Sequence, residues 1–403
     1  MIYEKETTRR QVLKSLPIGV LGVTDLMSYA SGMAFQRQTQ RTSPTRRIGL
    51  RGSAGTTGGF QQVAKLIAQD GDRDDEFGWS VAIDGGTAII GAVNDDDPNG
   101  SAGSEELSAG SAYVFERREG GSWSQAAKLS ADDGDTDGGF GYSVAIDGGT
   151  AIAGKWNEDT AGSAYVFEQG SNWSQTATLT AGHPSRFVVF VAIDGETTII
   201  GSPLDWQEPN GAAYVFERQS ESWSQAAKLS ADDGDGVGDS EFGWSVAIDE
   251  GTAVIGADND EDPSGNDTVL AYVFERGNES WSQAATLTVT DGDAGDWRTS
   301  SVAVDGETAI IGNANSNGDT SGSAYVFERR NGNWSQAAKL TVTDGDADDG
   351  FGVSVAIDGD TAIIGALRDE DSNGEVAGSA YVFERRSGGW SELSKLNAAD
   401  ADA

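Results

Sequence analysis

The stretch Phe77-Gly78-Trp79-Ser80-Val81-Ala82-Ile83-Asp84 decides the fold, because copies of it run through the chain. Close copies occupy residues 140–147, 242–249 and 351–358, and weaker copies occupy residues 187–194 and 298–305. The valine of the motif recurs about every 55 residues, a period typical of one repeated supersecondary unit. The sequence therefore predicts a tandem array of like units.

Each unit contains four short strand-like segments, which in the first unit are residues 77–84, 87–92, 111–117 and 123–129. The first segment is small and rich in glycine, as is needed where strands crowd around an axis. The second is apolar on both faces, so we expect it to be covered on both sides. The fourth alternates and carries Lys128, which suits an exposed edge. Repeated four-stranded sheets packed face to face predict an all-β fold, a β-propeller of four-stranded blades.

The number of blades stays open, because the fourth segment occurs once more than the others. Its copies begin at Phe60, Trp123, Trp173, Trp223, Trp281, Trp334 and Trp390. Six full units thus follow one extra segment. Either a six-bladed ring carries an additional strand, or a seventh blade is completed by residues without the motif, some of them within 33–60.

The units resemble FG-GAP repeats, as in the propeller of integrin α-chains. Phe-Gly stands at residues 77–78, 140–141, 242–243 and 351–352, and Gly-Ala at 91–92, 256–257 and 365–366. The resemblance covers residues 60 to 396. It implies a propeller, usually of seven blades, that serves adhesion or partner binding, often with calcium.

One departure from that family concerns calcium. Integrin-type repeats carry a DxDxDG-like loop between the first and second strands, whereas this chain has Asp84-Gly85-Gly86-Thr87 and similar short links. Such a link is a tight hairpin turn. It is too short to wrap a cation that needs six to eight oxygen ligands. The calcium sites that the resemblance implies are therefore expected to be absent.

The first 59 residues differ in composition from the repeats. The run from Thr8 to Lys14 resembles a twin-arginine export signal, and the apolar stretch from Leu16 to Val23 is too short to span a membrane. We expect an export signal at residues 1–32, a flexible basic linker at 33–59 and the propeller at 60–403. The protein is then extracellular or on the cell surface, and its mature chain has no transmembrane helix.

Composition excludes several classes of function. The net charge of −38 makes nucleic-acid binding improbable, since phosphate contact needs basic clusters. The chain has no cysteine and therefore no disulfides, and its one histidine, His183, is too few for a zinc site built from several histidines. An acidic, lysine-poor surface is typical of adaptation to high salt, where charge repulsion is screened.

Alternating strand direction sorts the links onto two faces. We call acidic face the side that carries the links between second and third strands and those between a fourth strand and the next unit. Its acidic links include residues 94–97, 132–135, 258–262, 291–293, 344–346 and 369–371. The opposite side, the turn face, has short turns and most of the arginines, including Arg117, Arg118, Arg218, Arg329, Arg330, Arg385 and Arg386.

The acidic links allow two interpretations. They form either a solvated surface or weak calcium sites, because spaced aspartates near a glycine resemble a calcium loop but lack the closing bidentate glutamate. Calcium is thus the one cofactor that this pattern indicates. The candidate ligands are Asp95, Asp97, Asp258, Asp260, Asp262, Asp369 and Asp371.

Departures from the repeat mark candidate partner-binding residues on the same face, since exposed aromatic and arginine side chains often anchor interfaces. These residues are Trp156, His183, Arg186, Trp206, Trp297 and Arg298. We expect a binding or adhesion module, not an enzyme, that contacts protein or glycan at the cell surface. The alternative is a carbohydrate-active propeller enzyme, a glycosidase or lyase, in which two carboxylates would act.

Overall fold

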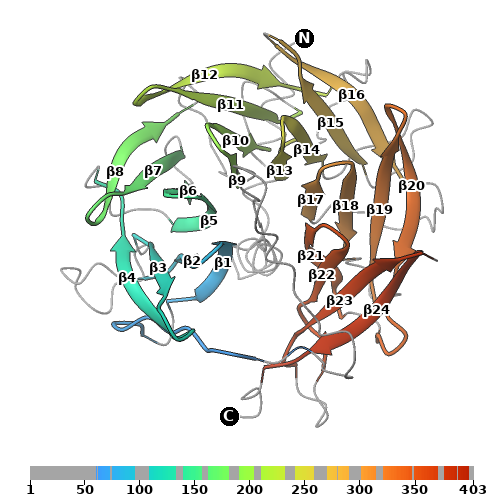
Figure 1. Ribbon diagram of the computed structural model, residues 1–403, viewed down its shortest axis with the longest axis horizontal. Helices are drawn as coiled ribbons and strands as arrows, with labels where there is room; N and C mark the ends of the chain where they lie inside the picture. The colour runs from blue at the N-terminus through green and yellow to red at the C-terminus, as the bar shows by residue number, and fades with distance from the viewer. Residues whose placement is uncertain are drawn as a thin grey trace, which may run out of the picture.

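The computed structural model contains six antiparallel sheets of four strands, arranged around an axis as the blades of a propeller (Figure 1). It describes residues 60, 62–72, 75–95, 109–132, 139–156, 162–180, 190–203, 210–231, 241–257, 270–278, 280–289, 301–314, 321–346, 349–370, 376–387 and 389–398. In each sheet the strands follow in chain order from the axis outward. Blades 1 to 6 are numbered here in the same order.

The bounds of the strands repeat closely from blade to blade. The first strands are β1 Phe77–Asp84, β5 Gly139–Asp147, β9 Phe190–Asp194, β13 Ser245–Asp249, β17 Ser301–Asp305 and β21 Phe351–Asp358. The second strands are β2 Thr87–Ala92, β6 Thr150–Trp156, β10 Thr197–Ser202, β14 Thr252–Ala257, β18 Thr308–Asn313 and β22 Thr361–Ala366. The third strands are β3 Ser111–Arg117, β7 Ser163–Gln169, β11 Ala212–Gln219, β15 Leu270–Arg276, β19 Ser323–Arg330 and β23 Ser379–Arg386. The fourth strands are β4 Trp123–Leu129, β8 Trp173–Leu179, β12 Ser222–Leu229, β16 Trp281–Thr288, β20 Asn333–Leu340 and β24 Gly389–Leu396.

A two-residue turn closes the first hairpin of each blade. In blade 1, Asp84 pairs with Thr87 across Gly85 and Gly86. Gly85 has a φ of 55°, which is the left-handed region that a two-residue hairpin turn requires. The Asp-Gly pair of the motif thus fixes the register of the hairpin.

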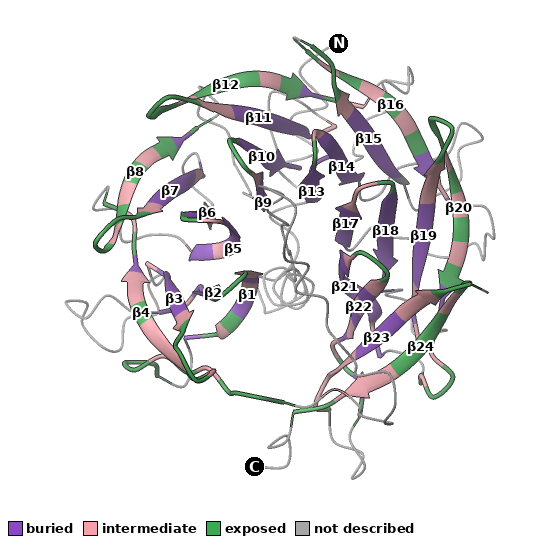
Figure 2. Ribbon diagram, viewed as in Figure 1, coloured by how far each residue is buried: buried purple, intermediate pink, exposed green. Residues whose placement is uncertain are grey.

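Burial falls from the axis to the rim (Figure 2). Second strands such as β10 and β14 are buried along their whole length, whereas fourth strands such as β8 alternate between half-buried and exposed residues. A strand apolar on both faces is sandwiched between neighbouring sheets. The predicted order of strands, from a covered inner position to an exposed edge, is confirmed.

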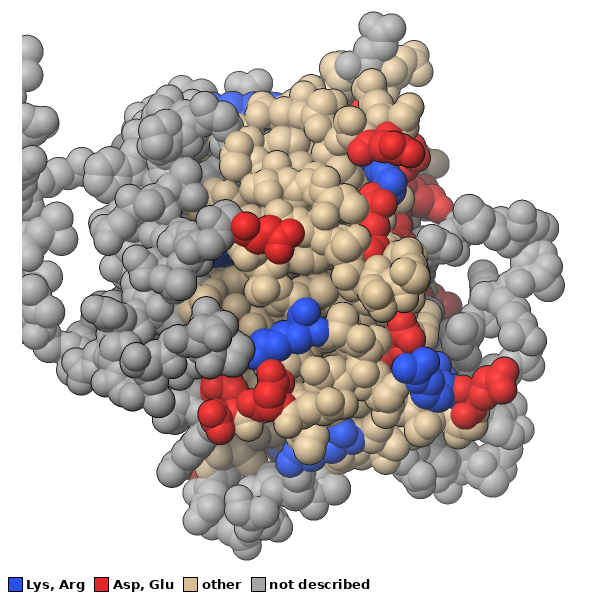
Figure 3. Space-filling view, turned by 90° about the vertical axis from the view of Figure 1, so that its left-hand side faces the viewer, with Lys and Arg blue, Asp and Glu red and all other residues tan. Residues whose placement is uncertain are grey.

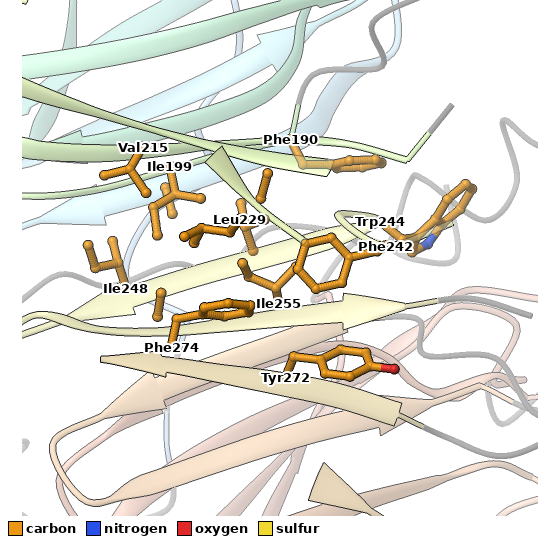
Figure 4. Close-up of a cluster of buried hydrophobic side chains, with 14 of the residues drawn as sticks. Phe190, Ile199, Val215, Leu229, Phe242, Trp244, Ile248, Ile255, Tyr272 and Phe274 are labelled. Carbon is orange, nitrogen blue, oxygen red and sulfur yellow. The ribbon is translucent and has the colours of Figure 1, made fainter. Parts of the chain in front are cut away.

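The hydrophobic core lies between blades and not within them. Figure 4 shows one such layer, in which Ile199 and Val215 of blade 3 pack against Phe242, Ile255 and other residues of blade 4. Equivalent layers join the other consecutive blades. Because every blade needs a neighbour to cover its apolar faces, the blades are stable as an array.

Two glycines of the motif allow neighbouring blades to approach backbone to backbone. A Cβ atom at Gly91 of β2 would lie 2.0 Å from the carbonyl oxygen of Gly141 in β5. Gly312 and Gly352 repeat this contact between blades 5 and 6. The glycine of Phe-Gly in one blade therefore contacts the glycine in the second strand of the preceding blade.

The predicted all-β propeller of four-stranded blades is confirmed, with six blades in the described residues. Some boundaries differ from the prediction. β13 begins at Ser245 and not at Phe242, because Phe242 does not pair with β14 as Phe77 pairs with Ala92 in blade 1. β5 begins one residue early, at Gly139, and β12, β20 and β24 begin one residue before the expected tryptophan. β9 and β17 begin at Phe190 and Ser301, and the residues predicted before them, 187–189 and 298–300, lie outside the described residues. Residues 60–66, predicted as an extra fourth segment, belong to no strand in the described structure. Residues 1–59, with the predicted export signal and linker, lie outside the described residues. The described part of the chain contains no helix of the length and apolarity that crossing a membrane requires.

Candidate functional site

Large aromatic rings gather at the end of the axis that belongs to the acidic face. The Tyr142 ring in β5 lies 5.6 Å from the Trp79 ring in β1 and 6.2 Å from the Trp156 ring at the end of β6. It also lies 5.8 Å from the ring of Phe190, which in turn lies 5.6 Å from that of Trp244. We call these five residues, Trp79, Tyr142, Trp156, Phe190 and Trp244, the aromatic cluster.

The cluster breaks the symmetry of the repeat. Trp79, Tyr142 and Trp244 follow Phe-Gly directly in blades 1, 2 and 4, whereas Val353 holds this place in blade 6. Trp79 and Trp244 are buried, but Tyr142 and Trp156 are only half-buried. Only parts of the Tyr142 and Trp156 side chains thus stay exposed on one side of the axis. Partly exposed rings backed by buried ones suit the anchoring of a ligand.

Two of the predicted calcium ligands, Asp95 and Asp369, are buried at the rim of the acidic face, each with 4% exposure. The Tyr113 hydroxyl donates a hydrogen bond of 2.5 Å to Asp95, and Lys128 Nζ lies 2.9 Å from the same carboxylate. In blade 6, Asp369 accepts a hydrogen bond of 2.9 Å from the Tyr381 hydroxyl and lies 2.7 Å from Lys395 Nζ. Each carboxylate is therefore engaged by an ammonium and a phenol.

Each of the two lysines also forms an ion pair with a second, more exposed aspartate. Lys128 Nζ also lies 2.8 Å from Asp70, and Lys395 Nζ lies 3.3 Å from Asp344. The hydrogen bond from Lys128 is the main cause that lowers the pKa of Asp70. Burial opposes ionisation of Asp369, but its bonds to Lys395, Ser379 and Tyr381 bring its pKa below the usual range. Asp70 and Asp369, whose pKa values are lowered, therefore stay ionised near neutral pH.

The other predicted calcium ligands, Asp97, Asp258, Asp260, Asp262 and Asp371, lie outside the described residues. So do the predicted partner-binding residues His183, Arg186, Trp206, Trp297 and Arg298, which leaves Trp156 as the described member of that set. Within the described ranges, no three His, Cys, Asp or Glu side chains form a group that could hold a metal ion.

The turn face carries a ring of aspartates around the axis, contributed by the last residue of the first strands. Asp84 accepts a hydrogen bond of 2.8 Å from the Gly148 amide of the next blade, and Asp147 accepts one of 2.6 Å from Gly195. Asp194, Asp249 and Asp305 make the same contact with the turns of blades 4, 5 and 6. Each carboxylate thus fastens its blade to the following one.

This ring is electrostatically strained. Burial is the main cause that raises the pKa values of Asp147 and Asp194, and the pKa of Asp249 rises to about 6. Neighbouring carboxylates add to the shift, because like charges disfavour ionisation.

A ladder of glutamates and arginines joins the third strands. Arg218 of blade 3 lies 2.8 Å from Glu168 of blade 2. The same contact recurs as Arg276–Glu217, Arg329–Glu275 and Arg385–Glu328, with Gln169–Glu116 between blades 1 and 2. Figure 3, which faces the outer edge of the blades on the left of Figure 1, shows acidic and basic side chains side by side along one border of that surface. Most arginines of the turn face therefore serve contacts between or within blades.

The sequence alone did not indicate most of the aromatic cluster or the aspartate ring. The signal for the cluster was the variable residue after Phe-Gly, which is Trp, Tyr, Trp or Val in the clear copies of the motif. The signal for the ring was the Asp that ends the motif in every unit. Neither pattern shows by itself that the residues of different units meet.

Comparisons with known proteins agree with this architecture. The family described as FG-GAP repeat matches residues 60–115, 123–167, 223–274, 281–327 and 334–383, which together make up more than half of the chain. No curated protein matches the sequence. Among solved structures, the periplasmic gluconolactonase PpgL of Pseudomonas aeruginosa shares 15% identity, with a TM-score of 0.49 over 78% of this chain and 83% of that one. The chain belongs to the FG-GAP repeat family.

Proposed function

We propose that the protein is an exported binding module that contacts a protein or glycan partner at the cell surface through the acidic face. The observation that carries this proposal is the aromatic cluster. It lies at the axis, on the face with the long links, and among the described residues it is confined to blades 1 to 4. A binding site on a repeat protein needs such a departure from symmetry, because identical blades offer identical surfaces.

The chemistry of this face favours binding. Half-buried rings such as Tyr142 and Trp156 offer a large contact area at a small cost in side-chain entropy. The described rim carboxylates Asp95 and Asp369 are neutralised by lysines, so they support the shape of the face and do not act as a free acid and base. We therefore propose that the partner is bound and released without a covalent change.

The proposal is tested by screening the full chain, in potassium chloride of about 1 M to screen charge repulsion, on arrays of glycans and cell-surface proteins. The same ligands are then incubated with the protein and analysed for cleaved products. We expect saturable binding to a restricted set of ligands and no turnover. Cleavage of any of these ligands, or binding to none of them, would overturn the proposal.

Export is the second part of the proposal, and it rests on the resemblance of residues 8–14 to a twin-arginine signal. Replacing Arg9 and Arg10 by Lys should retain the protein inside the cell. Fractionation of cells that produce either form measures this directly. Normal secretion of the variant would show that another route, or no signal, operates.

A further inference from the structure

In the part of the chain that the structure describes, the ring of blades is open between blade 6 and blade 1. The first strands of consecutive blades pack against one another from β1 to β21, but among the described strands β21 does not pack against β1 in this way (Figure 1). We call the space between these two blades the open sector. Its walls are residues that point toward a neighbour in every other blade: Phe77, Val81 and Ile83 of blade 1, and Ile363, Ala380 and Leu396 of blade 6.

Both walls of the open sector are apolar and incompletely covered. The wall residues of blade 1 are half-buried, whereas their counterparts in blade 2, Phe140, Val144 and Ile146, are each 1% exposed. The wall residues of blade 6 are also half-buried, whereas Ile310, Ala324 and Leu340 of blade 5 are no more than 3% exposed. Burial of these surfaces would be favourable, at roughly 25 cal/mol for each Å² removed from water.

At the open sector, the glycines that elsewhere contact the backbone of a neighbouring blade have no such contact among the described residues. A Cβ atom at Gly141 or Gly352 would lie within 2.4 Å of a backbone oxygen of the preceding blade, but one at Gly78 would meet no atom within 4 Å. A Cβ at Gly365 of blade 6 would meet only side chains of its own blade, Ser354 and Val353, whereas one at Gly312 would meet the backbone of the next blade. Blades 1 and 6 thus have glycines at the positions where other blades approach a neighbouring backbone closely.

The ladder of glutamate–arginine ion pairs between the third strands also ends at the open sector. Arg117 of blade 1 holds the position of Arg218 and Arg276, but no carboxylate of the described residues lies in ion-pair contact with its side chain. At the other wall, Glu384 pairs with Arg386 of its own blade, and no described arginine of another blade lies in ion-pair contact with it. The open sector therefore presents a cation on one wall and an anion on the other.

Residues 60–68 lie at the outer border of the open sector and match a fourth strand. Leu66 and Ala68 pack against blade 1 as Leu129 and Ala131 pack against blade 2. The Gln69 amide donates a hydrogen bond of 3.0 Å to the side chain of Gln125, as the Asp132 amide donates one of 3.1 Å to Gln175. Residues 62–68 thus take the place of the fourth strand of a seventh blade, and no strand of the described residues pairs with them.

We propose that the open sector binds a three-stranded sheet of FG-GAP type from a second polypeptide, which completes a seventh blade with residues 60–66 as its outer strand. The Phe of its first strand would pack on blade 6, and its third strand would end in Glu-Arg. That Glu would meet Arg117, and that Arg would meet Glu384. The exposed apolar walls, the glycines and the ladder all specify a sheet of this type.

Other occupants fit the observations less well. Residues 1–59 contain no copy of the Phe-Gly or Val-Ala-Ile-Asp motif that these contacts require. A second copy of the chain has its strands paired in six sheets of its own. It could fill the open sector only if three strands of one blade separated from their own sheet.

The test uses a synthetic peptide that copies residues 351–386, the first three strands of blade 6, added to the full chain in about 1 M KCl. We expect saturable binding by calorimetry and a higher melting temperature. A peptide in which the residue copied from Phe351 is Ala should bind at least tenfold more weakly, because a buried ring anchors each interface. A scrambled peptide is the control for nonspecific association.

Charge exchange tests the orientation of the bound sheet. Arg117→Glu in the protein should weaken binding about two- to fivefold, as expected for a partly exposed ion pair. A peptide that carries Arg in place of its Glu copied from Glu384 should restore the affinity for that variant. Arg330→Glu is the matched control, because Arg330 pairs with Glu328 of its own strand, away from the open sector.

Disulfide trapping tests the register, since the chain has no cysteine of its own. In blade 6, Val382 of the third strand pairs with Ser394 of the fourth. Ala64 holds the position of Ser394, so the peptide residue copied from Val382 should lie opposite Ala64. Cysteines at these two places should form a disulfide, whereas Val63→Cys should not, because successive side chains of a strand point to opposite faces.

Three results would overturn the proposal. The first is failure of the peptide to bind, or binding that neither the Phe change nor the charge exchange alters. The second is trapping at Val63→Cys in preference to Ala64→Cys. The third is a dimer of the full chain, seen by sedimentation, that the peptide dissociates, because a second copy would then occupy the sector.

Discussion

Asp249 is the last residue of β13, the innermost strand of blade 4. The pKa of its carboxyl is raised to about 6, mainly by burial and further by the charges of Asp305 and Asp194. The hydrogen bond from the Gly306 amide opposes this shift. A folded pKa above the unfolded value means that the native state binds more protons between about pH 4 and 6. The contribution of Asp249 to stability is therefore fully present below pH 4 and is lost as the pH rises through 6.

Asp249→Asn should remove this pH dependence. The amide oxygen of Asn can still accept the hydrogen bond from Gly306, but it carries no charge. We expect the variant to be more stable at pH 7, on the order of 1 kcal/mol after solvent screening, and to lose this advantage at pH 4. Urea unfolding at both pH values, with the exposed Glu221→Gln as a control for net charge, measures the effect. An equal gain from Glu221→Gln would assign it to overall repulsion.

Asp95 and Asp369 bear on the predicted calcium sites. Because a lysine and a tyrosine already bind each carboxylate, we expect neither to take part in calcium binding. The double change to Asn should leave a calorimetric titration with calcium in high salt unaltered, whether or not the remaining acidic links bind the ion. Loss of a saturable binding phase in this variant would show that calcium displaces the lysines.

Contacts between blades decide stability at the scale of strands. At Gly312 of β18 an added Cβ would lie 2.0 Å from the carbonyl oxygen of Gly352, so Gly312→Ala must force blades 5 and 6 apart. At Gly365, the same position in β22, the closest atom is the hydroxyl of Ser354, which can rotate away. We expect Gly312→Ala to lower the free energy of unfolding by about 2 kcal/mol or more, and Gly365→Ala by much less.

Denaturant unfolding of the two variants, at the same salt concentration, gives this comparison. The pair is matched, because both glycines precede the last residue of a second strand and differ in the neighbour they face. Equal destabilisation would mean that the backbone of another blade also covers Gly365, and that the open sector is closed in solution.

Strand positions could be predicted from the sequence, and contacts between blades could not. The Asp-Gly turns and the apolar second strands act locally, so the strand bounds in blade 1 agree with those expected from the motif. The predicted start of β13 was wrong, because Phe242 does not pair with the second strand of its blade as Phe77 and Phe351 do. The aromatic cluster was missed because its contacts cross between blades, since Tyr142 meets residues from blades 1 and 3 as well as its own.

For the whole molecule, net charge is the dominant property. A charge of −38 makes self-repulsion large where the Debye length is ~10 Å, at about 0.1 M salt, and much smaller where it is ~3 Å, at about 1 M. We expect the melting temperature to rise steeply with potassium chloride. The described turn-face ladder works against this trend, because its ion pairs weaken as salt screens them. A melting temperature that is the same at about 0.1 and 2 M KCl would contradict adaptation to high salt.

Binding of a partner to the acidic face through the aromatic cluster can be measured directly with single tryptophan variants. The dissociation constant of the tightest ligand from the arrays is compared between the parent chain, Trp156→Ala and Trp223→Ala. Trp156 belongs to the cluster, whereas Trp223 lies in β12 at the outer edge of blade 3. Because loss of an aromatic anchor typically costs 2 kcal/mol or more, we expect Trp156→Ala to weaken binding by at least about tenfold and Trp223→Ala to leave it unchanged, with both variants folded. Unaltered affinity in Trp156→Ala, or an equal loss in both variants, would show that the partner does not bind through the aromatic cluster.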